Sequence, residues 1–187
     1  MKFSMKKVTV LLADGFEEIE ALTVVDLLRR AKVYVDTVSI TDDYTVRGAH
    51  GIPVQTEDLI TEIDFKESDM IVLPGGMPGT TNLKEDENVR KAVQEAYDDG
   101  RYVAAICAAP TILADMGLLK GKRATCYPDM ESEIEDAYLT GAPVATDENI
   151  ITSQGVGTAI DFALKLIEVL ISEEIAVEIA DSIVYQR

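Results

Sequence analysis

The chain has one histidine and only two cysteines among its 187 residues. The single histidine, His50, cannot supply a zinc site built from several histidines, and Cys107 and Cys126 do not form a C-x-x-C pair. Two cysteines are also too few for a disulfide scaffold. The phosphate-loop pattern G-x-x-x-x-G-K-[ST] and the serine-elbow pattern G-x-S-x-G are both absent. We therefore expect neither a metal nor an organic cofactor.

Basic residues are scarce: the chain has 17 Lys and Arg but 34 Asp and Glu, which gives a net charge of −17. Such a surface repels phosphates, which excludes nucleic acid and anionic membranes as expected partners. Long apolar runs are missing too: Val8–Ala13 is far below the ~20 residues of a membrane span. The basic segment Met1–Lys7 precedes an apolar stretch that Asp14 ends too early for a signal peptide. We expect a cytoplasmic protein.

Length and composition, with 47% hydrophobic and 27% charged residues, indicate a single globular domain over residues 1–187. Short apolar runs alternate with helical patterns along the chain. The expected strands are Val8–Ala13, Tyr34–Ile40, Met70–Leu73, Tyr102–Ile106, Ala124–Cys126 and Ile150–Ser153. The expected helices are Glu18–Ala31, Val89–Tyr97, Ala109–Met116, Thr158–Ile171 and a last one capped by Ser172 through about Ile183. Strands that are apolar on both faces and alternate with helices predict an α/β fold with a mostly parallel sheet covered on both sides.

Two local patterns refine this expectation. Thr158 and Asp161 resemble a capping box at the start of their helix, with Asp in place of Glu or Gln. The segment Val46–Gln55 contains two glycines and a proline and indicates a hairpin rather than a crossover.

The first expected helix is apolar almost all round, so one stripe can face the sheet while the rest needs another partner. We expect a homodimer that forms through the Ile19–Ala31 helix. The alternative is that the Thr45–Asp58 segment of the same chain covers this face.

Cys107 lies at the junction between an expected strand and a helix that has Pro110 in its first turn. The carboxyl ends of parallel strands form the ligand crevice of such folds, and helix N–H groups there favour a thiolate. This strand–nucleophile–helix order is that of a nucleophile elbow. The alternative is a buried cysteine that acts as a small apolar side chain.

Other loops are expected at the same edge of the sheet. Glu20 follows the first strand within an apolar surround, where burial would raise its pKa, whereas Glu17 and Glu18 fit simple partners of the helix dipole. Gly75 and Gly76 follow another strand and can expose backbone N–H groups as an oxyanion site, or can form only a sharp turn.

Four segments follow one another in order along the chain: Asp14–Glu20, Leu73–Gly76, Ala104–Pro110 and Thr152–Ala163. Together they resemble the ThiJ/PfpI superfamily, on the branch of the Parkinson-disease-associated deglycase/glyoxalase. The resemblance spans nearly the whole chain and implies a flavodoxin-like three-layer sandwich and a homodimer.

The resemblance also implies residue roles. Cys107 matches the nucleophile, and Glu20 matches the carboxyl group that hydrogen-bonds its thiolate. Gly75, Gly76 and Ala108 match backbone donors around the substrate oxygen. The implied reaction is attack of the thiolate on a 2-oxoaldehyde such as methylglyoxal, giving lactate, or deglycation of methylglyoxal adducts.

The sequence departs from the family's pattern at two positions. Tyr127 stands where one branch has a histidine before a proline, and a phenol with a pKa of ~10 is a poor base at pH 7. Ala108 follows the cysteine where the peptidase-like branch has a histidine.

His50 aligns with a position, often basic, that approaches the partner's active site across the dimer. Cys126 is expected to be a plain strand-end cysteine rather than a resolving thiol.

We therefore expect a cysteine-dependent enzyme that acts on reactive aldehydes or glycated substrates. The first alternative is a non-enzymatic redox sensor or chaperone-like protein in which Cys107 is oxidised. The second is an amidotransferase-like hydrolase or peptidase, which the missing histidine next to Cys107 disfavours.

Overall fold

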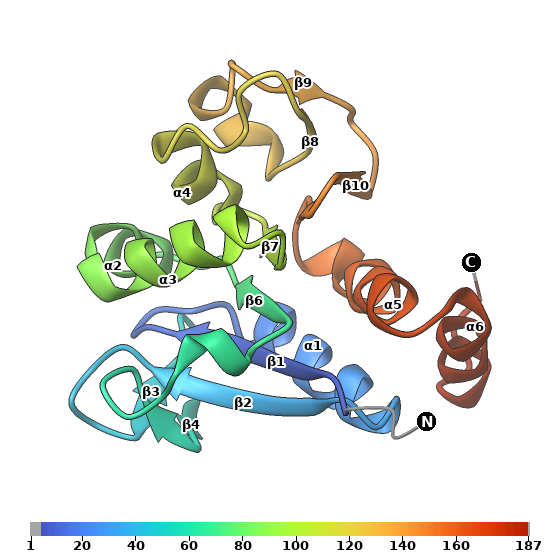
Figure 1. The fold of residues 1–187 in the computed structure, drawn as a ribbon, viewed down its shortest axis with the longest axis horizontal. Coiled ribbons are helices and arrows are strands. Elements are labelled where there is room, and N and C mark those ends of the chain that lie inside the picture. The colour runs from blue at the N-terminus through green and yellow to red at the C-terminus, as the bar shows by residue number, and fades with distance from the viewer. Residues whose placement is uncertain (1–4, 187) are drawn as a thin grey trace.

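A seven-stranded sheet forms the middle of the computed structural model, which describes residues 5–186 (Figure 1). The strand order is β10-β11-β7-β6-β1-β2-β5, and every neighbouring pair is parallel except β10 with β11. The strands are β1 (Lys7–Leu12), β2 (Tyr34–Ser39), β5 (Asp58–Leu59), β6 (Met70–Leu73), β7 (Tyr102–Ile106), β10 (Val144–Asp147) and β11 (Ile150–Ser153). Residues 1–4, part of the basic segment Met1–Lys7, lie outside the described residues.

Helices cover both faces of this sheet (Figure 1). One layer contains α1 (Glu18–Arg30), α5 (Ala159–Leu170) and α6 (Glu173–Ser182), and the other contains α2 (Gly79–Glu85), α3 (Glu87–Asp98) and α4 (Pro110–Asp115). The strands are buried because their side chains alternate between these two layers: Val8 and Val10 of β1 face the first, and Leu11 faces the second. The predicted three-layer α/β sandwich with a mostly parallel sheet is confirmed.

Four further strands lie outside the central sheet. They are β3 (Thr45–Arg47) with β4 (Pro53–Gln55), which pair antiparallel, and β8 (Arg123–Ala124) with β9 (Tyr138–Leu139), which pair parallel. The predicted hairpin is thus confirmed. The predicted strand Ala124–Cys126 was wrong in its extent and its place, because only β8 forms and it belongs to a separate two-stranded sheet.

The predicted capping box at Thr158 was also wrong. Thr158 precedes α5, but its side chain makes no capping hydrogen bond to that helix. Its Oγ1 instead lies 2.7 Å from Oγ of Ser153 and donates to the carbonyl of Gly155 at 3.0 Å. The hydroxyl therefore fixes the turn between β11 and α5. Ser172 does cap α6, because its side chain accepts a hydrogen bond from the N–H of Ile175.

The first helix packs against α5 on one side and against the hairpin at its N-terminal end. Val46 of the hairpin is buried in the same apolar cluster as α1. Ile19 and Leu22 remain exposed, at 52% and 38% of their surface. The hairpin therefore covers only part of the second apolar face, and the homodimer through Ile19–Ala31 stays a prediction.

Within residues 5–186, every helix is too short or too polar to cross a bilayer.

Candidate active site

Cys107 occupies the bend between β7 and α4. The strand ends at Ile106, and Pro110 starts the helix. The backbone of Cys107 has a φ of 65°, in the left-handed region that residues other than glycine rarely adopt. Two backbone hydrogen bonds hold this conformation: the N–H of Cys107 donates to Ser153 at 3.0 Å, and the N–H of Tyr127 donates to the carbonyl of Cys107 at 2.8 Å. The strained bend places the thiol at the carboxyl end of the sheet, as the elbow interpretation predicted.

Glu20 lies in the first turn of α1 and is fully buried. The N–H of Gly75 donates to its Oε2 at 2.9 Å, and its carboxyl lies beside the thiol of Cys107. Burial raises the pKa of the Glu20 carboxyl to about 7, and the nearby charge of Glu17 adds to this rise. The carboxyl is therefore a base that changes protonation state near neutral pH.

The thiol of Cys107 is not held as a thiolate, which corrects the expectation based on the helix N-terminus. Burial, and then the negative charge of Glu20, raise the pKa of Cys107 to about 12. The backbone N–H groups of Ala108 and Gly76 favour the thiolate and so lower the pKa, but they offset this rise only in part. The sulfur therefore rests as a thiol, beside a carboxyl that can accept its proton.

The two glycines after β6 have different roles. Gly76 presents its N–H to the sulfur, together with Ala108, where a negative charge on a bound substrate would develop. Gly75 uses its N–H to hold Glu20, so this donor orients the carboxyl rather than facing a substrate oxygen. A Cβ on Gly75 would lie 2.6 Å from Cβ of Cys107 and 2.7 Å from Oε2 of Glu20, so only glycine fits between these side chains.

An open pocket of about 390 Å³ lies over the thiol. Its lining consists of Glu17, Glu20, Gly76, Cys107, Tyr127, Pro128 and the segment 154–158. A Cβ placed on Gly155 would be 3.8 Å from both Sγ of Cys107 and Oε1 of Glu20, and 3.6 Å from the ring of Tyr127. Oε1 is buried and accepts no well-aligned hydrogen bond from the described residues. Oε1 of Glu20, Sγ of Cys107 and the ring of Tyr127 therefore surround the same position in the pocket, next to Gly155.

Sequence reasoning did not assign the segment 154–158 or Glu17 to the pocket. The pattern Gly155-Val156-Gly157 before a helix is the signal that marks a close approach of backbone to a ligand. Tyr127, which sequence reasoning did place at the site, is 44% exposed and forms one wall.

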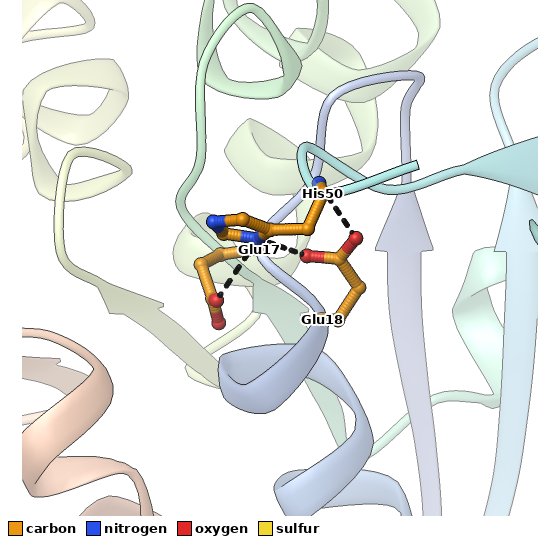
Figure 2. A group of neighbouring side chains, drawn as sticks. All are labelled: Glu17, Glu18 and His50. Carbon is orange, nitrogen blue, oxygen red and sulfur yellow. Dashed lines mark hydrogen bonds and ion pairs between the residues drawn. The ribbon is translucent and has the colours of Figure 1, made fainter. Parts of the chain in front are cut away.

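His50 lies on the turn between β3 and β4, next to Glu17 and Glu18 (Figure 2), and does not itself line the pocket. Its side chain is 70% exposed, and its Nδ1 is 2.8 Å from Oε2 of Glu18. That hydrogen bond raises the pKa of His50, and the charge of Glu18 adds to the rise. Glu17 is the N-cap of α1, because its Oε2 accepts from the N–H of Glu20 at 2.8 Å.

Cys126 is buried, with 1% of its surface exposed, and is not part of the pocket lining. Burial, and then the charges of Glu131 and Glu133, raise the pKa of its thiol to about 11. It is therefore a packed cysteine, as the sequence predicted.

The fold and site define a class of protein: a flavodoxin-like sandwich with a cysteine on a nucleophile elbow and a buried carboxyl beside it. The model of the DJ-1/PfpI family matches residues 6–169, and the chain belongs to this family.

Curated relatives and solved structures agree with this assignment. Protein DJ-1 homolog B from Arabidopsis thaliana is 39% identical over 98% of this chain, which spans 42% of that relative's length. The glutathione-independent glyoxalase DJ-1 of Schizosaccharomyces pombe is 33% identical, with 91% of this chain and 94% of that protein covered. The crystal structure of Drosophila melanogaster DJ-1beta has a TM-score of 0.94 at 33% identity, covering 98% of this chain and 100% of that one. Oxidized Toxoplasma gondii DJ-1 has a TM-score of 0.92 at 36% identity, covering 97% and 100%.

Proposed function

We propose that this protein is a cofactor-independent enzyme that converts reactive 2-oxoaldehydes such as methylglyoxal to 2-hydroxy acids. The observation that carries the proposal is the pair of Cys107 and Glu20, in which a buried carboxyl with a pKa raised to about 7 lies beside a thiol at the base of an open pocket. The likeness to the glyoxalase of Schizosaccharomyces pombe supports the same reaction class. The pocket of about 390 Å³ also leaves room for the rest of a methylglyoxal adduct on an amine or thiol, and so for deglycation.

The reaction starts with the transfer of the thiol proton to Glu20 as Sγ of Cys107 bonds to the aldehyde carbon. The aldehyde oxygen gains the negative charge, which the N–H groups of Gly76 and Ala108 stabilise before that oxygen is protonated. A hemithioacetal results.

Glu20 then carries a proton between the two substrate carbons. The former aldehyde carbon loses its hydrogen and becomes a thioester carbonyl, while the neighbouring ketone carbon gains a hydrogen and becomes an alcohol. The oxidation and reduction therefore balance within the substrate. Water cleaves the thioester, releasing lactate and restoring the thiol.

The direct test is lactate formation from methylglyoxal by the wild-type protein and by Cys107→Ala. We expect turnover by the wild type and its loss in the variant, because alanine cannot form the hemithioacetal. Thermal unfolding of both proteins controls for loss of structure. Equal turnover in both would contradict the cysteine mechanism.

Tyr127→Phe is expected to keep measurable activity. The phenol forms a wall of the pocket and can donate one hydrogen bond to the substrate, while Glu20 and Cys107 move the protons. Losing one neutral hydrogen bond costs on the order of 1 kcal/mol, which is a roughly fivefold to tenfold decrease in kcat/KM. Steady-state kinetics with methylglyoxal measure this. A loss as complete as that in Cys107→Ala would make Tyr127 the acid or base.

A second candidate function, redox sensing, is favoured by the accessibility of one thiol beside a carboxyl that can be protonated. Peroxide would convert the Cys107 thiol to sulfenic and then sulfinic acid, each step taking one oxygen from peroxide and releasing water. Protonated Glu20 could then donate a hydrogen bond to the sulfinate.

We expect mild peroxide to oxidise Cys107 in preference to Cys126. The reason is access rather than acidity, because both pKa values are raised, to about 12 and about 11, and only Cys107 lines the pocket. Peptide mass spectrometry after a short exposure measures the two products. Preferential oxidation of Cys126 would show that the pocket does not control access.

A further inference from the structure

Beside the pocket, Glu17, Glu18 and His50 bring three metal-ligating atoms together (Figure 2). Nδ1 of His50 is 2.8 Å from Oε2 of Glu18 and 3.8 Å from Oε1 of Glu17. One ligand atom from each of the three side chains lies within 4.8 Å of the others. Ligands that each lie ~2.0–2.1 Å from a tetrahedral zinc ion are about 3.4 Å apart, so small adjustments would bring all three into coordination distance.

The two carboxylates share one cationic partner, His50, which lies closer to Glu18 than to Glu17. The side chains of Glu17 and Glu18 are only 10% and 6% exposed, and among the described residues His50 is their one ion-pair partner. Oε1 of Glu17 accepts no hydrogen bond from residues 5–186, and its contact with His50 is long, at 3.8 Å. Adjacent carboxylates with little access to water are costly unless a cation or hydrogen-bond donors compensate them. Oε1 of Glu17 faces the imidazole across this gap, where a cation would lie.

The backbone already orients both carboxylates. Oε2 of Glu17 accepts from the N–H of Glu20, which leaves Oε1 free. Oε1 of Glu18 accepts from the N–H of His50 at 2.8 Å, which leaves Oε2 beside the imidazole. In each carboxylate, a backbone donor thus fixes one oxygen and leaves the other to face the imidazole. Hydrogen bonds of this kind orient the ligands in metal sites. A Cβ on Gly48 would overlap the Glu18 carboxylate, so glycine makes room for it.

We propose that Glu17, Glu18 and His50 bind a divalent transition-metal ion of the Zn²⁺ type. One imidazole nitrogen and two carboxylate oxygens are a donor set that suits Zn²⁺, whereas Mg²⁺ and Ca²⁺ prefer oxygen ligands alone. The ion takes the place of the proton between Nδ1 and Glu18, so one proton leaves as the ion binds. The exposed side of His50 lets the ion enter and leaves a coordination position for water.

Calorimetric titration with ZnCl₂ tests the proposal in a Cys107→Ser background, which removes the accessible thiol as a competing ligand. We expect one ion per chain with a dissociation constant below about 0.1 mM. Adding His50→Asn or Glu17→Gln should weaken binding by roughly tenfold or more. His50 is exposed, and the amide oxygen of a glutamine in place of Glu17 can still cap α1, so both variants should fold; circular dichroism checks this.

Glu135→Gln is the matched control, because it removes one exposed carboxylate elsewhere and should leave binding unchanged. X-ray absorption of the zinc-loaded wild-type protein should show nitrogen and oxygen ligands that include one imidazole. Three results would each overturn the proposal. They are the absence of saturable binding, an affinity in the His50→Asn and Glu17→Gln variants equal to that of the Cys107→Ser protein, and a sulfur ligand in the absorption spectrum.

Discussion

Replacing Glu20 with glutamine is expected to lower turnover of methylglyoxal by about 10²–10⁴-fold, the usual contribution of a positioned general base. Glutamine keeps the size of the side chain and can still accept from the N–H of Gly75. It cannot take the thiol proton of Cys107, and burial, the largest cause of the raised pKa of that thiol, still disfavours the thiolate in the variant. The carboxyl alone, with a pKa of about 7, is suited to that transfer.

The pH dependence of kcat/KM tests the same role. The base must be ionised, so the wild-type rate should rise about tenfold per pH unit below pH ~7 and level off above it. Glu20→Asp keeps an ionisable carboxyl in the same surroundings and should retain this rise, while Glu20→Gln should lose it. A Glu20→Gln protein with turnover within fivefold of wild type would show that another group activates the sulfur.

The sequence predicted those parts of the fold that depend on long apolar patterns. The strand bounds at Met70–Leu73, Tyr102–Ile106 and Ile150–Ser153 agree with the structure, because buried parallel strands are continuous apolar runs. Short elements were missed. The helix α2 starts at Gly79 after a glycine- and proline-rich stretch that is typical of a turn. The edge strand β10 is a short antiparallel addition whose pairing depends on tertiary contacts.

At the site, the sequence placed the elbow and predicted the raised pKa of Glu20, but it did not predict the raised pKa of Cys107. A helix N-terminus predicts a lowered pKa for Cys107, yet burial and the charge of Glu20 outweigh it. The burial of the Cys107 thiol and its closeness to Glu20 depend on the folded arrangement, so a linear sequence does not show them. The use of the Gly75 N–H by Glu20 was likewise hidden, because it joins residues 55 positions apart.

The same burial of Glu20 should make Glu20→Gln more stable than wild type at alkaline pH. Folding raises the pKa of this carboxyl from 4.5 to about 7, so the folded state favours the protonated form. The stability that this proton contributes is complete below the unfolded pKa and is lost as pH rises through about 7. Glutamine is neutral throughout. The difference in unfolding free energy should therefore be near zero at pH 4.5 and reach about 3 kcal/mol in favour of the variant above pH ~8.

Urea denaturation of both proteins at about pH 5 and about pH 8, at one fixed protein concentration, measures this difference. Other titrating groups contribute equally to wild type and variant, so subtracting the two curves isolates Glu20. The thiol of Cys107 is protonated in the wild type throughout this range, because its pKa is raised to about 12, and burial keeps disfavouring its thiolate in the variant. Glu135→Gln, which changes an exposed carboxyl elsewhere in the protein, is the matched control for the loss of one carboxyl. If Glu20→Gln shifted stability equally at both pH values, the wild-type carboxyl would not be carrying a buried charge at pH 8. The base that the proposed reaction requires would then have to be sought among the other residues of the pocket.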